Sequence, residues 1–264
     1  MSETYIVVAD RFANFSASSE SVVTETQAIE RIIGDEFPFD DIRLLIEHGV
    51  DYSNVRRAID RMDADDRYEI VLGGSDPVAP QRLAHKANPS NILIGYPRRV
   101  AEHRYELDVV FNPDSEFFAD HMTGMHIQGM AIMEAARQSF LAVTEEFHLR
   151  GNGRKYYFVI QNFNTTFLSF LFPLEAKLEY EVRSYAAKAD RHAFDVAIKI
   201  RQGGAICAEF AIAFTAFPEE RIAEKEGEKA RDAVSDRLAD FVLETGAPYG
   251  LPTGGETQIG RAHV

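Results

Sequence analysis

The chain has 264 residues, a hydrophobic fraction of 45%, a formal net charge of −14 and one cysteine, Cys207. This composition can bury one large core or two smaller ones, and its negative charge disfavours nucleic acid and anionic membranes as partners. A lone cysteine excludes an internal disulfide, and no apolar run reaches the roughly 18 residues of a membrane span, so we expect a cytosolic protein.

Residues 1–74 have the pattern of a small α/β module. The segment Thr24-Glu25-Thr26-Gln27 has the spacing of a capping box and predicts a helix that ends near Gly34. Apolar residues at helical spacing predict a second helix, Phe39–His48, and Ser53 is a candidate cap for a third, Ser53–Met62. The expected strands are Tyr5–Val8 and Tyr68–Leu72. Nothing in this module indicates a chemistry.

Residues 78–218 predict an α+β domain. Two strands, Asn91–Ile94 and Arg104–Phe111, flank a turn at Tyr96–Arg99. A helix from about Gln128 to Leu149 follows, and its first half is apolar on nearly every side, which indicates burial. The expected later strands, most of them alternating, are Lys155–Gln161, Thr166–Phe172, Ala176–Tyr185, Phe194–Ile200 and Ile206–Phe214. An antiparallel sheet must therefore curl around one long buried helix.

The tail, residues 219–264, is charged and then rich in glycine and proline. We predict a helix at Asp232–Leu243 and partial disorder elsewhere in the tail. The final segment, Gln258–Val264, resembles a translated sequencing adapter, so we expect the native chain to differ after about Thr257. The alternative is an ordinary disordered tail.

Glu134 is the unusual residue of the long helix, because it lies in the part predicted to be buried. A buried carboxylate is costly unless it is paired, and Arg137, three positions later, can pair with it. One interpretation is a purely structural ion pair. The other is a carboxylate whose pKa is tuned by its surroundings for general acid or base catalysis.

Two histidines, His121 and His126, precede this helix in a segment that contains Gly124. Either is a candidate catalytic group, and the alternative is a solvated surface histidine. Gly129 begins the helix, and the free N–H groups of a helix N-terminus can hold a thioester oxygen as charge develops on it. Cys207 lies in a strand pattern and is expected to be a buried structural thiol.

Other polar residues are weaker candidates. Asn162 is a possible substrate contact, but Asn162–Thr166 is also a candidate hairpin turn. Four cations are candidates for a patch that an acidic carrier protein would need: Arg98, Arg99, Arg154 and Lys155. The sequence has no zinc-ligand spacing, P-loop or dinucleotide motif, so we expect no metal and no cofactor.

The segment from His126-Ile127-Gln128-Gly129-Met130 through Glu134-Ala135-Ala136-Arg137-Gln138 resembles the A-factor biosynthesis hotdog family. Arg82–Lys86 also matches a region of that family. The resemblance covers roughly residues 78–218 and implies a hotdog fold. It also implies transfer of a β-ketoacyl chain from carrier protein to a small hydroxyl acceptor such as dihydroxyacetone phosphate, in signalling-lactone (γ-butyrolactone) or secondary-metabolite synthesis.

By the same resemblance, Glu134 corresponds to the acidic residue of hotdog dehydratases, and His121 or His126 to their histidine. Arg137 would orient Glu134 or bind the phosphate of the acceptor. Gly129, Met130 and Gln138 would contact the substrate, an acyl carrier protein or CoA thioester.

Two features depart from the family pattern. Gln128 replaces the usual proline, and the chain shows one hotdog repeat where members commonly show two. A single repeat implies either a homodimer formed through the hotdog sheet or a second repeat that has been lost beyond the suspect C-terminal segment. The alternatives to acyl transfer are a hotdog dehydratase, a thioesterase, and a non-catalytic acyl-binding partner whose Glu134–Arg137 pair is structural.

Overall fold

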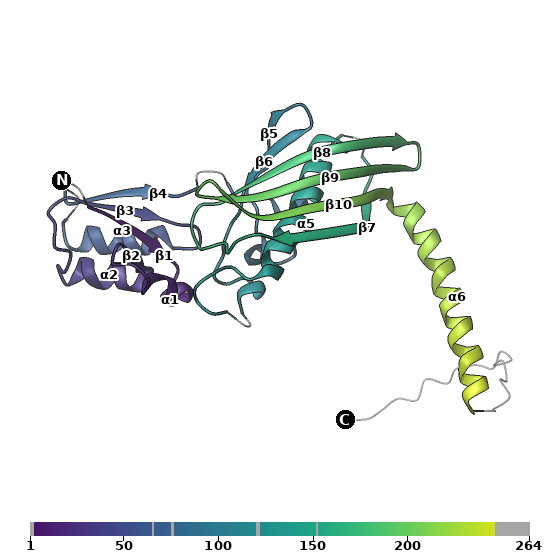
Figure 1. The fold of residues 1–264 in the computed structure, drawn as a ribbon, viewed down its shortest axis with the longest axis horizontal. Coiled ribbons are helices and arrows are strands. Elements are labelled where there is room, and N and C mark those ends of the chain that lie inside the picture. Colours follow the sequence, from purple (N-terminus) through teal and green to yellow (C-terminus); the bar gives the residue numbers. More distant parts are fainter. Residues whose placement is uncertain (1–2, 65, 75–76, 120–121, 152, 246–264) are drawn as a thin grey trace, which may run out of the picture.

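The computed structural model describes residues 3–64, 66–74, 77–119, 122–151 and 153–245. They form two sheets (Figure 1). A parallel sheet of strand order β2-β1-β3-β4 belongs to the N-terminal module, and an antiparallel sheet of order β5-β6-β8-β9-β10-β7 wraps one long helix, α5. This second unit has the predicted hotdog fold and is called the hotdog domain below.

The N-terminal module alternates strands and helices, as predicted. The capping box is confirmed: the Thr24 hydroxyl accepts a bond from Gln27 N–H, and the Gln27 side chain accepts one from Thr24 N–H. The elements are β1 (Glu3–Val8), η1 (Asp10–Phe12), α1 (Ala13–Ser16), β2 (Val22–Thr24), α2 (Glu25–Ile33), β3 (Ile42–Ile46), α3 (Tyr52–Arg61) and β4 (Tyr68–Leu72).

The predicted helix Phe39–His48 is wrong, because this segment contains β3. Its buried side chains are Ile42, Leu44 and Ile46, an alternation of period two. The strand lies between β1 and β4 and pairs in parallel with both, so its outcome depends on partners that are distant in sequence.

The hotdog domain surrounds α5 (Gly129–Phe147), close to the predicted helix. On this helix Phe140 stacks on Phe214 of β10, with ring centroids 4.4 Å apart. Burying such a ring stabilises the fold by about 1.5–3 kcal/mol. Cys207 is buried, as predicted. The other elements are α4 (Gln81–Ala84), η2 (Pro89–Asn91), β5 (Arg98–Ala101), β6 (Arg104–Asp108), η3 (Glu116–Phe118), β7 (Tyr156–Phe167), β8 (Lys177–Lys188), β9 (Arg191–Gln202) and β10 (Ala205–Pro218).

Four expectations about this domain are wrong. The separate strand Thr166–Phe172 is not formed, because β7 ends at Phe167 and residues 168–172 are not in a strand. The strand Asn91–Ile94 is replaced by the end of η2 and an isolated bridge at Ile94. The turn Tyr96–Arg99 is incorrect, because Arg98 and Arg99 belong to β5. The hairpin turn Asn162–Thr166 is also incorrect, because β7 runs through it and pairs with β10 along its length. Polar side chains there follow the two-residue period of an edge strand.

The tail begins with α6 (Glu219–Thr245), which is longer than the predicted Asp232–Leu243 and projects away from the hotdog sheet (Figure 1). Residues 246–264, including Gln258–Val264, lie outside the described residues. Within the described part of the chain, no helix is both long and apolar enough to cross a membrane.

The module and the hotdog domain share a hydrophobic core. Val8 and Phe12 are fully buried in the same cluster as Phe118, Ile127 and Ala131 of the hotdog domain. Phe12 meets Phe118 edge to face, with centroids 6.4 Å apart. The segment after β1 is therefore built into the region that precedes α5.

Candidate functional site

Glu134 lies on the second turn of α5 and is held by three donors. Arg137 forms a two-point pair with it, with Nε 2.8 Å from Oε2 and Nη2 2.9 Å from Oε1. Lys86 Nζ lies 2.7 Å from Oε1, and Gln138 Nε2 donates to the same oxygen at 3.0 Å. The predicted Glu134–Arg137 pair is thus present, and Lys86 and Gln138 extend it.

This network keeps Glu134 ionised. Burial alone would raise the pKa of Glu134, but hydrogen bonds from Arg137, Lys86 and Gln138 outweigh that cost, so its pKa lies below the ordinary value. A carboxylate with a lowered pKa is a weak base. The geometry therefore suits Glu134 to orienting cations and stabilising positive charge.

Gln138 fixes the helix to the segment before β5. Its side chain is fully buried, its oxygen accepts from Leu93 N–H at 2.9 Å, and its amide donates to the Asn91 carbonyl at 2.8 Å. The second amide hydrogen serves Glu134. Because both amide hydrogens are used, this geometry makes Gln138 a support for Glu134.

Two cavities lie at opposite ends of the seam between α5 and β7. The first, here called the apolar groove, has a volume of about 570 Å³ and lies at the N-terminus of α5. It is lined by His126, Ile127, Gly129, Ile132, Phe167, Leu168, Ser169 and Phe170. The groove therefore combines apolar walls with one imidazole and a helix N-terminus.

Gly129 lines this groove close to Phe167. A Cβ at this position would lie 3.1 Å from Phe167 Cζ, so glycine lets the aromatic ring approach the helix. The first helical bond of α5 is from Ala131 N–H to the Gln128 carbonyl, so the amides of Gly129 and Met130 precede the helical ladder. His126 contacts Phe170, with centroids 4.6 Å apart.

The second cavity, here called the cationic pocket, has a volume of about 410 Å³. It is lined by Arg82, His85, Arg137, Leu141, Glu145, Lys155, Tyr156, Tyr157 and Phe158. Most of its polar groups are already in pairs, for example His85 with Glu145 at 2.6 Å and Lys155 with Glu219 at 2.9 Å. Arg137 joins this pocket to Glu134.

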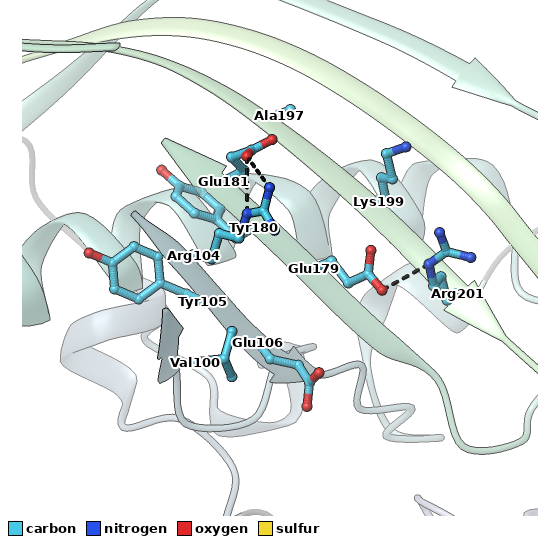
Figure 2. Close-up of a pocket in the computed structure, with 10 residues that line it drawn as sticks. All are labelled: Val100, Arg104, Tyr105, Glu106, Glu179, Tyr180, Glu181, Ala197, Lys199 and Arg201. Carbon is cyan, nitrogen blue, oxygen red and sulfur yellow. Dashed lines mark hydrogen bonds and ion pairs between the residues drawn. The ribbon is translucent and has the colours of Figure 1, made fainter. Parts of the chain in front are cut away.

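Figure 2 shows a third hollow, of about 400 Å³, on the hotdog sheet. Its charged side chains alternate with buried ones, so they lie on the face away from α5. Arg104 pairs with Glu181 at 3.1 Å and Arg201 with Glu179 at 2.8 Å across neighbouring strands. A ladder of exposed ion pairs lines this hollow. Such pairs contribute little to stability and are typical of a solvated surface.

The structure separates the predicted site residues. His126 and Gly129 share the apolar groove, while Glu134, Arg137 and Gln138 form the charged network. Met130 is 62% exposed, so the helix is not buried on every side as expected. Asn162 is exposed on β7 and lines neither cavity of the seam. His121 lies outside the described residues.

Lys86 is the part of the network that the sequence did not assign to the site. It follows α4 and comes from 48 positions before Glu134. The preceding residue, His85, has φ +51, an uncommon backbone state for a side chain of this size. The resemblance of Arg82–Lys86 to the family was the available signal, but it gave these residues no role.

Comparisons with known proteins identify the family of the hotdog domain. A model of the family described as "A-factor biosynthesis hotdog domain" matches residues 76–218. Among solved structures, the dehydratase heterocomplex ApeI:P from Xenorhabdus doucetiae is similar at 11% identity and a TM-score of 0.44, covering 57% of this chain and 97% of that chain. A mutant thioesterase from Pseudomonas aeruginosa is similar at 16% identity and a TM-score of 0.37, covering 56% and 99%. No curated protein matches this chain.

Proposed function

Because the chain belongs to the A-factor biosynthesis hotdog family, we propose that it transfers an acyl group from a thioester to a hydroxyl of a small acceptor. A β-ketoacyl chain is the proposed donor group, and a phosphorylated triose such as dihydroxyacetone phosphate is the proposed acceptor. The product class is a precursor of signalling lactones or related secondary metabolites. Buried Cys207 fits a reducing compartment, and we place the reaction in the cytosol.

One observation carries this proposal: the apolar groove, the Glu134 network and the cationic pocket follow one another along the α5–β7 seam. Gly129 and Arg137 are eight positions apart on the helix, which is about 12 Å along its axis. An acyl chain fits the apolar end, and an anionic group fits the end lined by Arg82, Arg137 and Lys155. Dehydration or simple hydrolysis requires no cationic end.

The proposed chemistry uses His126 as the base. The thioester carbonyl lies against the amides of Gly129 and Met130, which stabilise its oxygen as negative charge develops. His126 takes the proton of the acceptor hydroxyl, and the hydroxyl oxygen bonds to the carbonyl carbon. The C–S bond then breaks, and the proton returns from His126 to the leaving thiolate. Glu134 stays ionised and holds Arg137 toward the acceptor.

The proposal includes a thioester carrier and a second copy of the chain. Acyl carrier protein and CoA thioesters are both suitable donors. Strand β7 is an edge of the hotdog sheet, and exposed apolar side chains, including Ile160 and Phe167, lie on it. Such an edge is a template for pairing with another strand, and we propose that it forms a homodimer that closes the seam. Met130 is exposed on α5, which forms one side of the seam, and the second copy would cover it.

Mass spectrometry tests the reaction directly. A β-ketoacyl carrier protein is incubated with the protein, with and without dihydroxyacetone phosphate. Acyl loss that requires the acceptor and yields a phosphorylated ester supports transfer. Acyl loss without acceptor indicates hydrolysis, loss of water from a β-hydroxyacyl donor indicates dehydration, and no change in any reaction favours a binding role.

A pair of matched histidine variants assigns the base. His126→Asn is expected to reduce acyl transfer at least 100-fold, within the range that general base catalysis contributes. His103→Asn makes the same change at an exposed position with φ +61, which asparagine tolerates, and should leave transfer unchanged. Equal rates for the two variants would contradict the role of His126.

A further inference from the structure

The segment that carries His126 is held by the N-terminal module. The Asn14 side chain donates to the Thr123 carbonyl at 2.6 Å, and Phe15 N–H donates to the Gly124 carbonyl at 2.9 Å. Both donors belong to α1 of the module. Among the described residues, every hydrogen bond that leaves residues 122–126 goes to this short helix.

Gly124 shows how closely the two parts approach. Its φ is +71, and a Cβ there would lie 3.1 Å from the Arg11 carbonyl oxygen and 3.5 Å from Asn14 Nδ2. Arg11 also reaches the hotdog domain, where its Nη1 donates to the Phe118 carbonyl at 2.9 Å. The backbone before α5 is thus fixed at both residues 118 and 123–124 by residues 11–15.

The same helix supports the opposite wall of the apolar groove. Phe15 stacks on Phe172, with centroids 5.3 Å apart and an interplanar angle of 22°. Phe172 contacts Phe170 at 6.4 Å, and Phe170 contacts the His126 ring at 4.6 Å. An aromatic series therefore runs from the module to the imidazole.

Within its own segment, His126 has weak support. Its Nδ1 lies 3.5 Å from Thr123 Oγ1, at the long limit of a hydrogen bond, while the Thr123 hydroxyl also accepts from Met125 N–H at 3.2 Å. The position of the imidazole consequently depends on Thr123 and Phe170, and both are held through α1.

We propose that α1 of the N-terminal module positions His126, with Asn14 and Phe15 as its positioning residues. The inference rests on the proposed function for the role of His126, and it gives the module a part in the reaction. Neither residue touches substrate. Their effect is to keep the imidazole at a fixed distance from the amides of Gly129 and Met130, where small displacements are costly to the rate.

The test combines amide hydrogen exchange with kinetics on the full chain. Asn14→Ala and Phe15→Leu are compared with Asn54→Ala, a matched control that removes the bond from Asn54 to Glu25 (2.7 Å) inside the module. The first two variants should exchange the amides of residues 122–128 about fivefold faster, as expected for one lost hydrogen bond or ring contact. The control should not change them.

In the transfer assay, the first two variants should lower kcat about tenfold and change KM for the acyl carrier protein less than about twofold. Unchanged exchange at residues 122–128 would overturn the inference, as would faster exchange with unchanged kcat. If the parent protein transfers no acyl group but exchange rises only in Asn14→Ala and Phe15→Leu, the proposed function fails, while the module is still shown to hold this segment.

Discussion

Glu47 provides the sharpest test of the electrostatics at the junction of the two sheets. It follows β3, is 5% exposed, and its Oε2 has no hydrogen-bond partner among the described residues. Burial raises the pKa of Glu47 to about 7; a backbone hydrogen bond at Glu175 lowers it, and the Glu175 charge raises it. The folded state therefore prefers the neutral carboxyl.

The sign of the effect follows from linkage. A carboxyl whose pKa rises on folding contributes stability that is fully present below its unfolded value of 4.5 and is lost as pH rises to about 7. The difference between these two pKa values corresponds to about 3 kcal/mol. Glu47→Gln keeps the shape and stays neutral. Relative to the parent, the variant should therefore gain about 3 kcal/mol of unfolding free energy between pH 4.5 and pH 8.

Urea unfolding followed by circular dichroism at pH 4.5, 6 and 8 measures this difference. The difference is the useful quantity because other groups titrate in the same window. Glu20→Gln makes the same change on the exposed surface and reports the effect of losing one charge. If the difference between Glu47→Gln and the parent stays constant within about 0.5 kcal/mol across this range, the reasoning about Glu47 is refuted.

Three further predictions concern other parts of the fold. Glu134→Gln leaves Arg137 and Lys86 without their carboxylate, so acyl transfer should fall at least 100-fold. Thermal unfolding should show a loss of about 1–3 kcal/mol in stability. Unchanged turnover would contradict the proposed site. Gly49→Ala should destabilise the fold more than the control Gly151→Ala. Both glycines have positive φ, but only a Cβ at Gly49 would meet backbone, 2.2 Å from the Phe111 carbonyl oxygen. Equal losses in thermal melts would contradict this reasoning. Burial, aided by nearby cations, lowers the pKa of His148 to about 4, so about 3 kcal/mol of stability should be lost as pH falls from 6.5 to 4, and His148→Phe should remove that loss in acid titrations.

The elements that the sequence predicted well are those determined by short-range patterns. The α2 capping box needs only Thr24 and Gln27, and the Glu134–Arg137 pair needs only a spacing of three on a helix. The alternation of apolar and polar residues likewise predicted strands β8 to β10, because one face of each is buried and the other faces solvent. A local pattern fixes each of these without knowledge of the rest of the fold.

The wrong elements depended on distant partners. In β3, Ile42, Leu45 and Ile46 have helical spacing, yet Leu44 is buried and Leu45 is not, because β1 and β4 pair on either side. In β7, a run of polar residues resembled a turn, but β10 continues to pair with it. Lys86 was missed for the same reason, since only the folded chain brings it to Glu134.

Two buried carboxylates with opposite behaviour distinguish the seam from the domain junction. Glu134 receives bonds from Arg137, Lys86 and Gln138, so its pKa falls despite burial, and it remains charged at neutral pH. Glu47 has one carboxylate oxygen unpartnered among the described residues, so burial dominates and its pKa rises to about 7. Ionised Glu134 anchors the guanidinium of Arg137, which lines the cationic pocket. The seam thus keeps a positive charge where an anionic acceptor is proposed to bind. At the junction, the described residues provide no donor for Glu47 Oε2, and the packing there is accordingly most stable when Glu47 is neutral.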